Sequence, residues 1–268
     1  MGSAKTMAAV AAAAFISIPA AQAADLPVPV PVIHDFSGWY LRGDIGMSNE
    51  KLKGLSHPSF ATATAFTWYD RGGFDSAPFF GLGIGYAWNS WLRFDVTGEY
   101  RGKADFHALD RFLNAGVYNT NDYTGSKSEW LFLANVYFDL GTWWYVTPFV
   151  GAGIGITHNI IAHFRDTNVI AGGGGWADTG TQTNFAWALY AGAAYQVTPQ
   201  VTLEFAYRYL DLGDARTGTL VNLDPTIVGT NRAPMTFRDI TSHDLKFGVR
   251  WMLEPPEQVF APPLIRKG

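Results

Sequence analysis

Eight stretches of this chain alternate bulky apolar residues with small or polar ones. In the last stretch Leu245, Phe247, Val249, Trp251 and Leu253 alternate with Lys246, Gly248, Arg250 and Met252. A period of two indicates β-strands, because successive side chains of a strand point to opposite faces of the sheet. Each stretch has about ten residues or a little more, the length that a tilted strand needs to cross a bilayer. Such strands fit either a soluble sheet or the wall of a transmembrane barrel.

The connections between the strands decide between these two folds. The predicted strands are residues 38–47, 79–88, 91–101, 129–139, 148–157, 185–197, 201–211 and about 239–253. Long connections (48–77, 102–127, 158–182 and 213–238) alternate strictly with short ones (89–90, 141–146 and 198–200). Long loops outside and tight turns in the periplasm give this pattern in a membrane barrel, whereas a soluble sandwich has no reason to alternate. The sequence therefore predicts an all-β fold, an eight-stranded antiparallel up-and-down transmembrane β-barrel over residues 38–253.

The two ends of the chain differ from the barrel segment. Residues 1–23 have a cationic start, a short apolar core and an A-x-A site at Ala21–Ala23, which indicates a secretory signal peptide removed on export. The alternative is an Ala-rich helix at the start of a cytoplasmic protein. Residues 24–37 and 254–268 are rich in proline, and we interpret them as a periplasmic leader and a periplasmic tail.

Composition excludes several classes of function. The chain has no cysteine, which rules out a disulfide framework and Cys-ligated metals. Its net charge of −4 and the lack of a basic run give no support to nucleic-acid binding. Beyond the signal peptide we find no apolar run long enough for a transmembrane helix. Aromatic residues make up 15% of the chain, with ten tryptophans among them, and an interfacial aromatic girdle accounts for this excess.

The inward face of the predicted barrel carries charges of both signs. They are Arg42, Asp44, Arg93, Asp95, Glu99, Glu204, Arg208, Lys246 and Arg250. An unpaired buried charge is very costly, so we expect a paired network across the lumen. An eight-stranded lumen is only wide enough for side chains to fill, so the sequence predicts no porin-scale conductance. Arg101 and Asp139 are expected at the rims, where they would face solvent.

Three short motifs suggest enzymes or nucleotide sites but lack the required geometry. The glycines of residues 81–85 and 151–155 repeat every second residue without a helix pattern, so they predict small inward positions rather than a phosphate loop. Ser242, His243 and Asp244 are consecutive on a strand and cannot all point to one side. His57 and Ser59 resemble the pair of outer-membrane lipid deacylases but lie in a predicted loop. We therefore predict no catalytic residue and no enzyme activity.

Histidines are the remaining candidate ligands. His57, His107, His158 and His163 fall in or beside the predicted surface loops, where Tyr69, Tyr118 and Tyr123 also lie. Together they could bind haem, but solvated loop residues are the simpler interpretation. Their spacing does not favour a metal site, and we predict no cofactor. Residues 171–180, "AGGGGWADTG", are expected to form a flexible loop tip.

Five segments give the chain a family resemblance. They are "AADLP", "FSGWYLRGDIG", "PFVGAGIG", "YRYLDLG" and "HDLKFGVRWML". In this order they resemble the small outer-membrane β-barrel proteins of Gram-negative bacteria, the opacity-protein or porin-like group of alphaproteobacteria. The resemblance implies an eight-stranded barrel in the outer membrane. It also implies a signal for the barrel assembly machinery in the last strand, which Lys246, Gly248, Trp251 and Leu253 match.

The resemblance also suggests a function and partners. Members of the family serve as surface proteins, envelope stabilisers, adhesins and in some cases haem binders. The leading hypothesis is thus a surface-exposed protein that supports envelope integrity. It would contact outer-membrane lipid and lipopolysaccharide, and host or surface ligands through its long loops. The alternative is a protein that binds haem or another small ligand, or a narrow porin.

Overall fold

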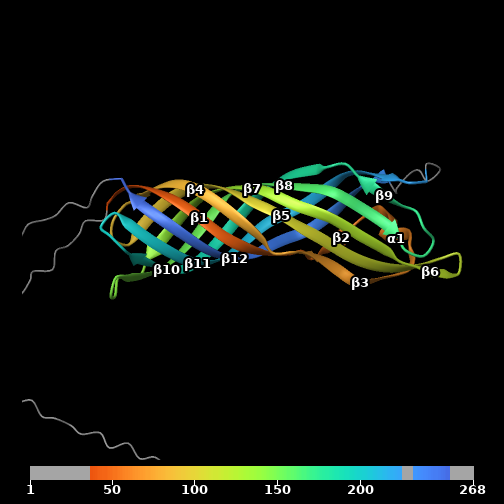
Figure 1. The fold of residues 1–268 in the computed structure, drawn as a ribbon, viewed down its shortest axis with the longest axis horizontal. Coiled ribbons are helices and arrows are strands. Elements are labelled where there is room, and N and C mark those ends of the chain that lie inside the picture. The colour runs from red at the N-terminus through yellow and green to blue at the C-terminus, as the bar shows by residue number, and fades with distance from the viewer. Residues whose placement is uncertain (1–36, 225–231, 254–268) are drawn as a thin grey trace, which may run out of the picture. The chain divides into compact units, whose positions relative to one another are not determined.

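A computed structural model of the protein describes residues 37–224 and 232–253. The predicted signal peptide, the tail and all but the last residue of the leader lie outside the described residues. Eight long strands pair antiparallel in a closed ring, in the order β1–β4–β5–β7–β8–β10–β11–β12 and back to β1 (Figure 1). Their bounds are β1 Gly38–Lys51, β4 Ala77–Ala87, β5 Leu92–Asn114, β7 Asn121–Asp139, β8 Val146–Asn168, β10 Gly180–Gln196, β11 Val201–Asn222 and β12 Pro234–Met252. The predicted eight-stranded barrel is confirmed.

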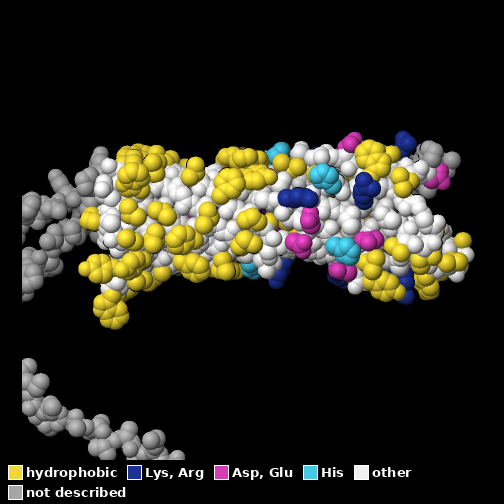
Figure 2. Space-filling view, viewed as in Figure 1, with side chains coloured by type: hydrophobic (Ala, Val, Ile, Leu, Met, Phe, Trp, Pro, Cys, Tyr) yellow, Lys and Arg dark blue, Asp and Glu magenta, His cyan; other side chains and the backbone are white. Residues whose placement is uncertain are grey.

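Side chains alternate between the two faces of the wall as the sequence predicts. On β1, Trp39 and Ile45 point outward and are 53% and 61% exposed, whereas Tyr40, Arg42 and Asp44 point inward and are buried. Outward apolar side chains cover one half of the barrel, and charged side chains appear on the other half (Figure 2). This apolar belt is the part of the wall that fits a bilayer.

Glycines on the inward face make room for large inward side chains. A Cβ atom on Gly85 would lie 2.3 Å from the ring of Tyr40, and one on Gly151 would lie 2.5 Å from the ring of Tyr137. Since real Cβ atoms do not approach other atoms so closely, these positions accept only glycine without a shift of the neighbour. The prediction of small inward positions at residues 81–85 and 151–155 is confirmed.

The prediction of four long loops is wrong, because strands continue through most of these segments. β5 and β8 have 23 residues each, about twice the predicted length. The segment between β1 and β4 contains β2 (Gly54–Ser56), the short helix α1 (Pro58–Thr62) and β3 (Thr64–Phe74). β6 (Val117–Asn119) follows β5. β9 (Gly174–Ala177) pairs with β8 and β11, so half of the expected flexible tip at residues 171–180 is part of the wall.

The loop prediction failed because the apolar face changes sides beyond the lipid belt. On β5 past Arg101, Ala104, Phe106 and Ala108 point inward and are buried, whereas Lys103, Asp105 and His107 are exposed. A register shift between Arg101 and Ala104 interrupts the alternation, so even-numbered residues face outward before it and inward after it. Beyond this shift the outward side chains meet water instead of lipid, and an apolar outward face no longer marks the strand.

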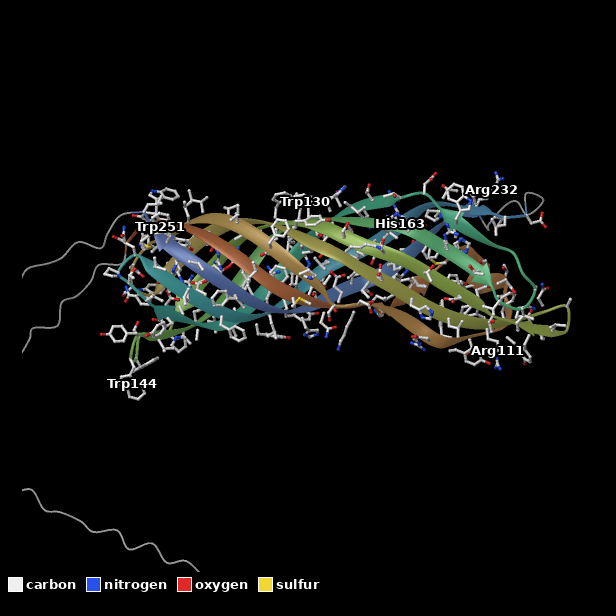
Figure 3. The ribbon with its side chains drawn as sticks, in the orientation of Figure 1. Arg111, Trp130, Trp144, His163, Arg232 and Trp251 are labelled. Atoms are coloured by element: carbon white, nitrogen blue, oxygen red, sulfur yellow. The ribbon has the colours of Figure 1, made fainter. Side chains whose placement is uncertain are left out.

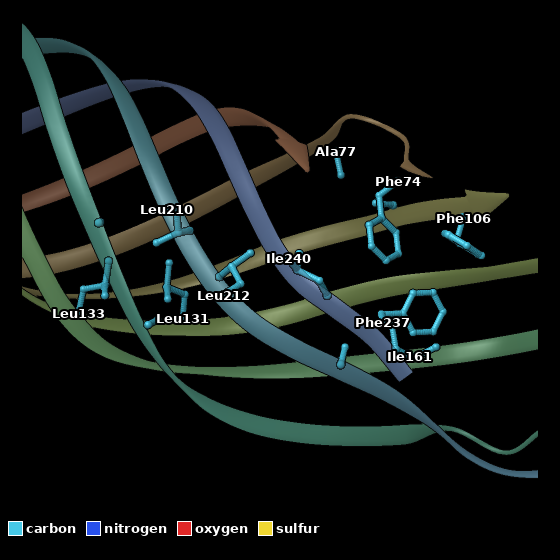
Figure 4. Close-up of a cluster of buried hydrophobic side chains, with 14 of the residues drawn as sticks. Phe74, Ala77, Phe106, Leu131, Leu133, Ile161, Leu210, Leu212, Phe237 and Ile240 are labelled. Atoms are coloured by element: carbon cyan, nitrogen blue, oxygen red, sulfur yellow. The ribbon is translucent and has the colours of Figure 1, made fainter. Parts of the chain in front are cut away.

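An apolar core fills the barrel beyond the belt. Phe74, Phe106, Phe164 and Phe237 pack ring against ring, with centroids of the Phe106–Phe237 pair 4.9 Å apart. Ile161, Leu212 and Ile240 extend the core toward the lumen (Figure 4). We call this part of the barrel, from about Arg101 on β5 to the tip of α1, the outer extension.

Aromatic side chains surround the opposite end of the belt. Trp39, Trp88, Trp91 and Trp251 are each more than half exposed there, as expected for an interfacial girdle. Trp144, in the turn between β7 and β8, is 93% exposed and projects from the wall (Figure 3). Within residues 37–224 and 232–253, no helix has the length and apolarity to span a membrane.

Candidate functional site

A network of buried ion pairs fills the lumen inside the apolar belt. The nine charged residues predicted to face inward all do so, and each has an oppositely charged side chain within 4 Å. Arg42 is central at one level: it contacts Asp44 at 2.9 Å, Asp95 at 2.5 Å and Glu204 at 3.1 Å. Strands β1, β5 and β11 are thereby joined through the lumen.

Glu204 on β11 collects several cations at the same level. Its carboxylate lies 2.9 Å from Arg93 Nη1 and 3.6 Å from Arg250 Nε, in addition to Arg42. The Arg93 guanidinium also stacks over the rings of Tyr137 and Phe149, at 4.6 and 4.8 Å from their centroids. Ion pairs and cation–π contacts therefore fix Arg93 in one place.

A second level of the network lies nearer the outer extension. Arg208 donates two hydrogen bonds of 2.7 Å to Glu99 and two more to Asp244. Arg101 contacts Asp244 at 2.7 Å and also Glu129, and Lys127 contacts Glu50 at 2.9 Å. Lys246 connects the two levels, with Asp44 at 3.1 Å and Glu99 at 3.4 Å.

The sequence prediction missed four members of this network and misplaced another. Glu50, Lys127, Glu129 and Asp244 are buried inside the lumen. Three of them lie in or next to segments assigned to loops, but Glu50 keeps the parity of Arg42 and Asp44, which was a usable signal. The expectation that Arg101 faces solvent at a rim is wrong: its side chain is 1% exposed, because the strand continues well beyond it. Asp139 lies at the rim as expected but pairs with Arg93 at 2.9 Å.

The suspected catalytic motifs form no catalytic triad. Ser242 and Asp244 point into the lumen, whereas His243 points outward and bonds the Tyr207 hydroxyl at 2.6 Å. His57 Nδ1 lies 2.6 Å from Ser59 Oγ, and His57 Nε2 lies 3.1 Å from the carbonyl oxygen of Ala233. His57 is the N-cap residue of α1, so this contact has a local structural role.

The four candidate histidines do not converge on one site. His57 lies inside the barrel mouth, whereas His107, His158 and His163 lie on the outward faces of β5 and β8. His107 pairs with Asp122 at 3.0 Å, and His158 contacts Thr183 at 2.8 Å. In the described part of the chain, no group of three or more His, Asp or Glu side chains is arranged to hold a metal ion.

A pocket of about 430 Å³ opens at the mouth of the outer extension. α1 and β3 form one side with Phe60 and Phe66, and β5, β7 and β8 form the other with Asp110, Tyr123 and Asp166. Burial raises the pKa of Asp110, and burial together with the charge of Asp110 raises the pKa of Asp166 to about 7. Burial lowers the pKa of His57, which keeps this ring neutral at pH 7. Sequence reasoning missed the pocket because its walls were assigned to loops.

Comparison with known proteins agrees with this architecture. A family model described as "Outer membrane protein beta-barrel domain" matches residues 8–252. An uncharacterized protein of Brucella abortus is 31% identical over 225 residues, which cover 72% of this chain and 76% of the relative. The outer membrane protein PagN of Salmonella typhimurium is 25% identical over 139 residues, covering 50% of this chain and 56% of PagN.

Solved structures are similar to this chain only at low sequence identity. Neisserial surface protein A is 19% identical, and the match covers 81% of this chain and 98% of that protein with a TM-score of 0.42. The fold assignment rests on the closed strand ring and on the family match.

Proposed function

Because the chain belongs to the outer membrane β-barrel family, we propose that it is a closed surface protein that supports the envelope and acts through its outer extension. The protein resides in the outer membrane, and its apolar belt contacts lipid. The observation that carries the proposal is the filled lumen. Two levels of buried ion pairs, and the apolar core above them, occupy the space that a porin leaves open to water.

The outer extension gives the protein its surface for interaction. In place of long loops, paired strands continue the wall of the barrel beyond the lipid belt, with exposed polar and charged residues such as Asp105, His107 and Arg165. This wall is a fixed surface, so a partner would meet side chains on strands that need no ordering on binding. Host or surface ligands would contact this wall.

The envelope role is tested in a Gram-negative host that lacks the gene. We expect loss of the protein to raise sensitivity to SDS with EDTA, and wild-type protein to restore resistance. A variant with a packed lumen but altered outer wall, such as His107→Ala with Asp105→Asn, separates surface interaction from barrel integrity. Unchanged sensitivity in the deletion strain would contradict the envelope role.

We also propose that lipopolysaccharide binds where the apolar belt ends. Lys51 lies on β1 four residues beyond Met47 on the same outward face, and Lys103 is exposed on β5. Lysines at this height suit the phosphates of an outer-leaflet lipid. Lys51→Ser with Lys103→Ser should reduce the lipopolysaccharide that copurifies with the barrel, whereas Arg232→Ser should not. Equal amounts on all three proteins would contradict this site.

The orientation of residues in the last strand supports the proposal that the barrel assembly machinery recognises this chain. Lys246 and Gly248 point inward, whereas Trp251 and Leu253 point outward and are 55% and 48% exposed. Trp251→Ala should lower the amount of folded barrel in cells without slowing refolding of the purified chain. Trp39→Ala, which removes an equally exposed girdle residue from β1, is the matched control. Equal loss of folded barrel in both variants would contradict a signal specific to β12.

A further inference from the structure

The mouth pocket has the size and lining of a small-molecule site. Its volume of about 430 Å³ lies in the range typical of ligand pockets, and it opens at the end of the barrel that carries α1. Phe60 and Phe66 stack at 4.8 Å between ring centroids, and Tyr123 approaches Phe60 edge-on at 6.4 Å. Aromatic rings therefore line the pocket on both of its sides.

The polar side of the pocket is acidic. Asp110 and Asp166 line it, and no lysine or arginine is among its described lining residues. Asp110 is fully engaged, because it accepts hydrogen bonds from Tyr123 Oη at 2.6 Å and from the backbone N–H of Asn121 at 3.0 Å. Asp110 therefore holds the pocket wall together.

Asp166 differs from Asp110 in having an acceptor atom without a partner. Its Oδ1 is shielded from solvent and makes no hydrogen bond within the described residues. Buried acceptors are almost always satisfied, so an unsatisfied carboxylate oxygen in a pocket indicates a missing donor. A donor with a positive charge would also compensate the charge of Asp166.

We propose that the mouth pocket binds an organic cation, a primary ammonium group attached to an apolar or aromatic body. The ammonium would pair with the Asp166 carboxylate while the body lies against Phe60, Phe66 and Tyr123. An ammonium also gains from the faces of aromatic rings. An inorganic metal ion fits less well, since two aspartates offer too few ligands and the neutral His57 has both ring nitrogens engaged. This site is independent of the envelope role proposed above.

Binding should strengthen as pH rises through about 7, because the ligand selects the ionised form of Asp166. The titratable groups that line the pocket with Asp166 are Asp110 from β5, Tyr123 from β7 and His57 before α1. β9, β11 and β12 contribute the uncharged residues Gly175, Asn222 and Met235. The pKa of His57 is lowered and that of Tyr123 is raised, whereas the pKa of Asp166, about 7, lies inside the range from pH 6 to 8.

The test is isothermal titration of the refolded full-length mature protein in detergent micelles with phenethylammonium. We expect saturable binding at pH 8 that weakens at least fivefold at pH 6, and much weaker binding of the neutral analogue 2-phenylethanol. Nα-acetyl-lysine methylamide serves as a second cationic probe. A preference for it points to a lysine side chain of a partner, and a preference for phenethylammonium points to a free amine.

Two variants connect any binding to the pocket. Asp166→Asn should weaken phenethylammonium binding at least tenfold at pH 8 and remove the pH dependence. Asp105→Asn, an exposed aspartate on the outward face of β5, should leave both unchanged. Heat-modified migration on a gel confirms that each variant is folded. No binding of either cation to the wild type, or equal binding of 2-phenylethanol or by Asp166→Asn, would overturn the proposal.

Discussion

Arg208 on β11 holds Glu99 on β5 through two parallel hydrogen bonds of 2.7 Å, although the two strands lie on opposite sides of the ring. Both side chains are fully buried. A bidentate pair of this geometry fixes both groups in orientation as well as distance. The wall is thus tied across its diameter in addition to the hydrogen bonds between neighbouring strands.

Replacing Glu99 with Gln should lower the free energy of unfolding by about 3–5 kcal/mol, because it leaves the buried Arg208 and Lys246 short of a negative charge. Urea unfolding in lipid vesicles, followed by tryptophan fluorescence, measures this change. Asp105→Asn breaks the exposed pair with Lys103, 3.1 Å apart, and should change stability by no more than about 1 kcal/mol. Similar values for the two variants would show that the lumen pair contributes no more than a surface pair.

The purified wild-type barrel should show no steady porin-scale current in planar bilayers. Glu204→Ala leaves Arg42, Arg93 and Arg250 without their shared carboxylate, so it should lower stability and admit brief, small openings. Phe237→Ala in the outer core should open no current by itself, because the ion-pair network below it stays intact. Large and steady single-channel currents from the wild type would contradict a closed lumen.

The part of the fold inside the bilayer could be predicted from the sequence because outward side chains there contact lipid and are therefore apolar. Trp39, Leu41 and Ile45 must face lipid, so their parity fixes that of Tyr40 and Arg42, and the strand count follows. The nine predicted lumen charges point inward for the same reason. The register between β1 and its neighbours β4 and β12 places inward residues beside inward residues and outward residues beside outward ones.

The outer extension could not be predicted in the same way because its outward face contacts water, so its apolar residues face inward. Phe106 and Phe237 form a core inside the barrel, while polar residues of the opposite parity face solvent, so the apolar signal changes sides within one strand. The contacts at the pocket include one between residues far apart in sequence, His57 Nε2 with the carbonyl oxygen of Ala233. Neither composition nor period indicates such contacts in a single sequence.

An arginine on the outward face should cost stability according to its height. Phe205 is 58% exposed within the apolar belt, so Phe205→Arg places a cation in hydrocarbon and should cost about 2–4 kcal/mol. His107 faces outward on β5 above the belt, and His107→Arg should be nearly neutral. Unfolding in vesicles of defined lipid compares the two. An equal cost would place His107 in the bilayer and move the edge of the belt.

Adding a methyl group at an inward glycine should destabilise the barrel strongly. Gly153→Ala would place its Cβ 2.1 Å from Asn135 Oδ1, and Asn135 also bonds Asp95 and Tyr190. We expect a loss of about 1–3 kcal/mol from overpacking. Gly54→Ala is the control, since a Cβ there meets nothing within 4 Å. The folded fraction after refolding at increasing urea measures both variants, and a neutral Gly153→Ala would mean that the lumen has spare volume.

Stability should fall as pH rises from about 4 to 7, through the raised pKa of Asp166. In this window the folded protein keeps a proton on Asp166 that the unfolded chain, with a pKa near 3.9, has released, so proton loss favours unfolding. Above pH 7 both states are ionised and the slope ends. The lowered pKa of His57 gives the opposite slope below about pH 6.5, so the difference between wild type and Asp166→Asn isolates the aspartate. Urea midpoints at pH 4.5, 6 and 7.5 should show the wild type losing stability relative to Asp166→Asn at each step. A constant difference between the two proteins would mean that Asp166 is ionised throughout the range and that the mouth pocket is already negatively charged at pH 5.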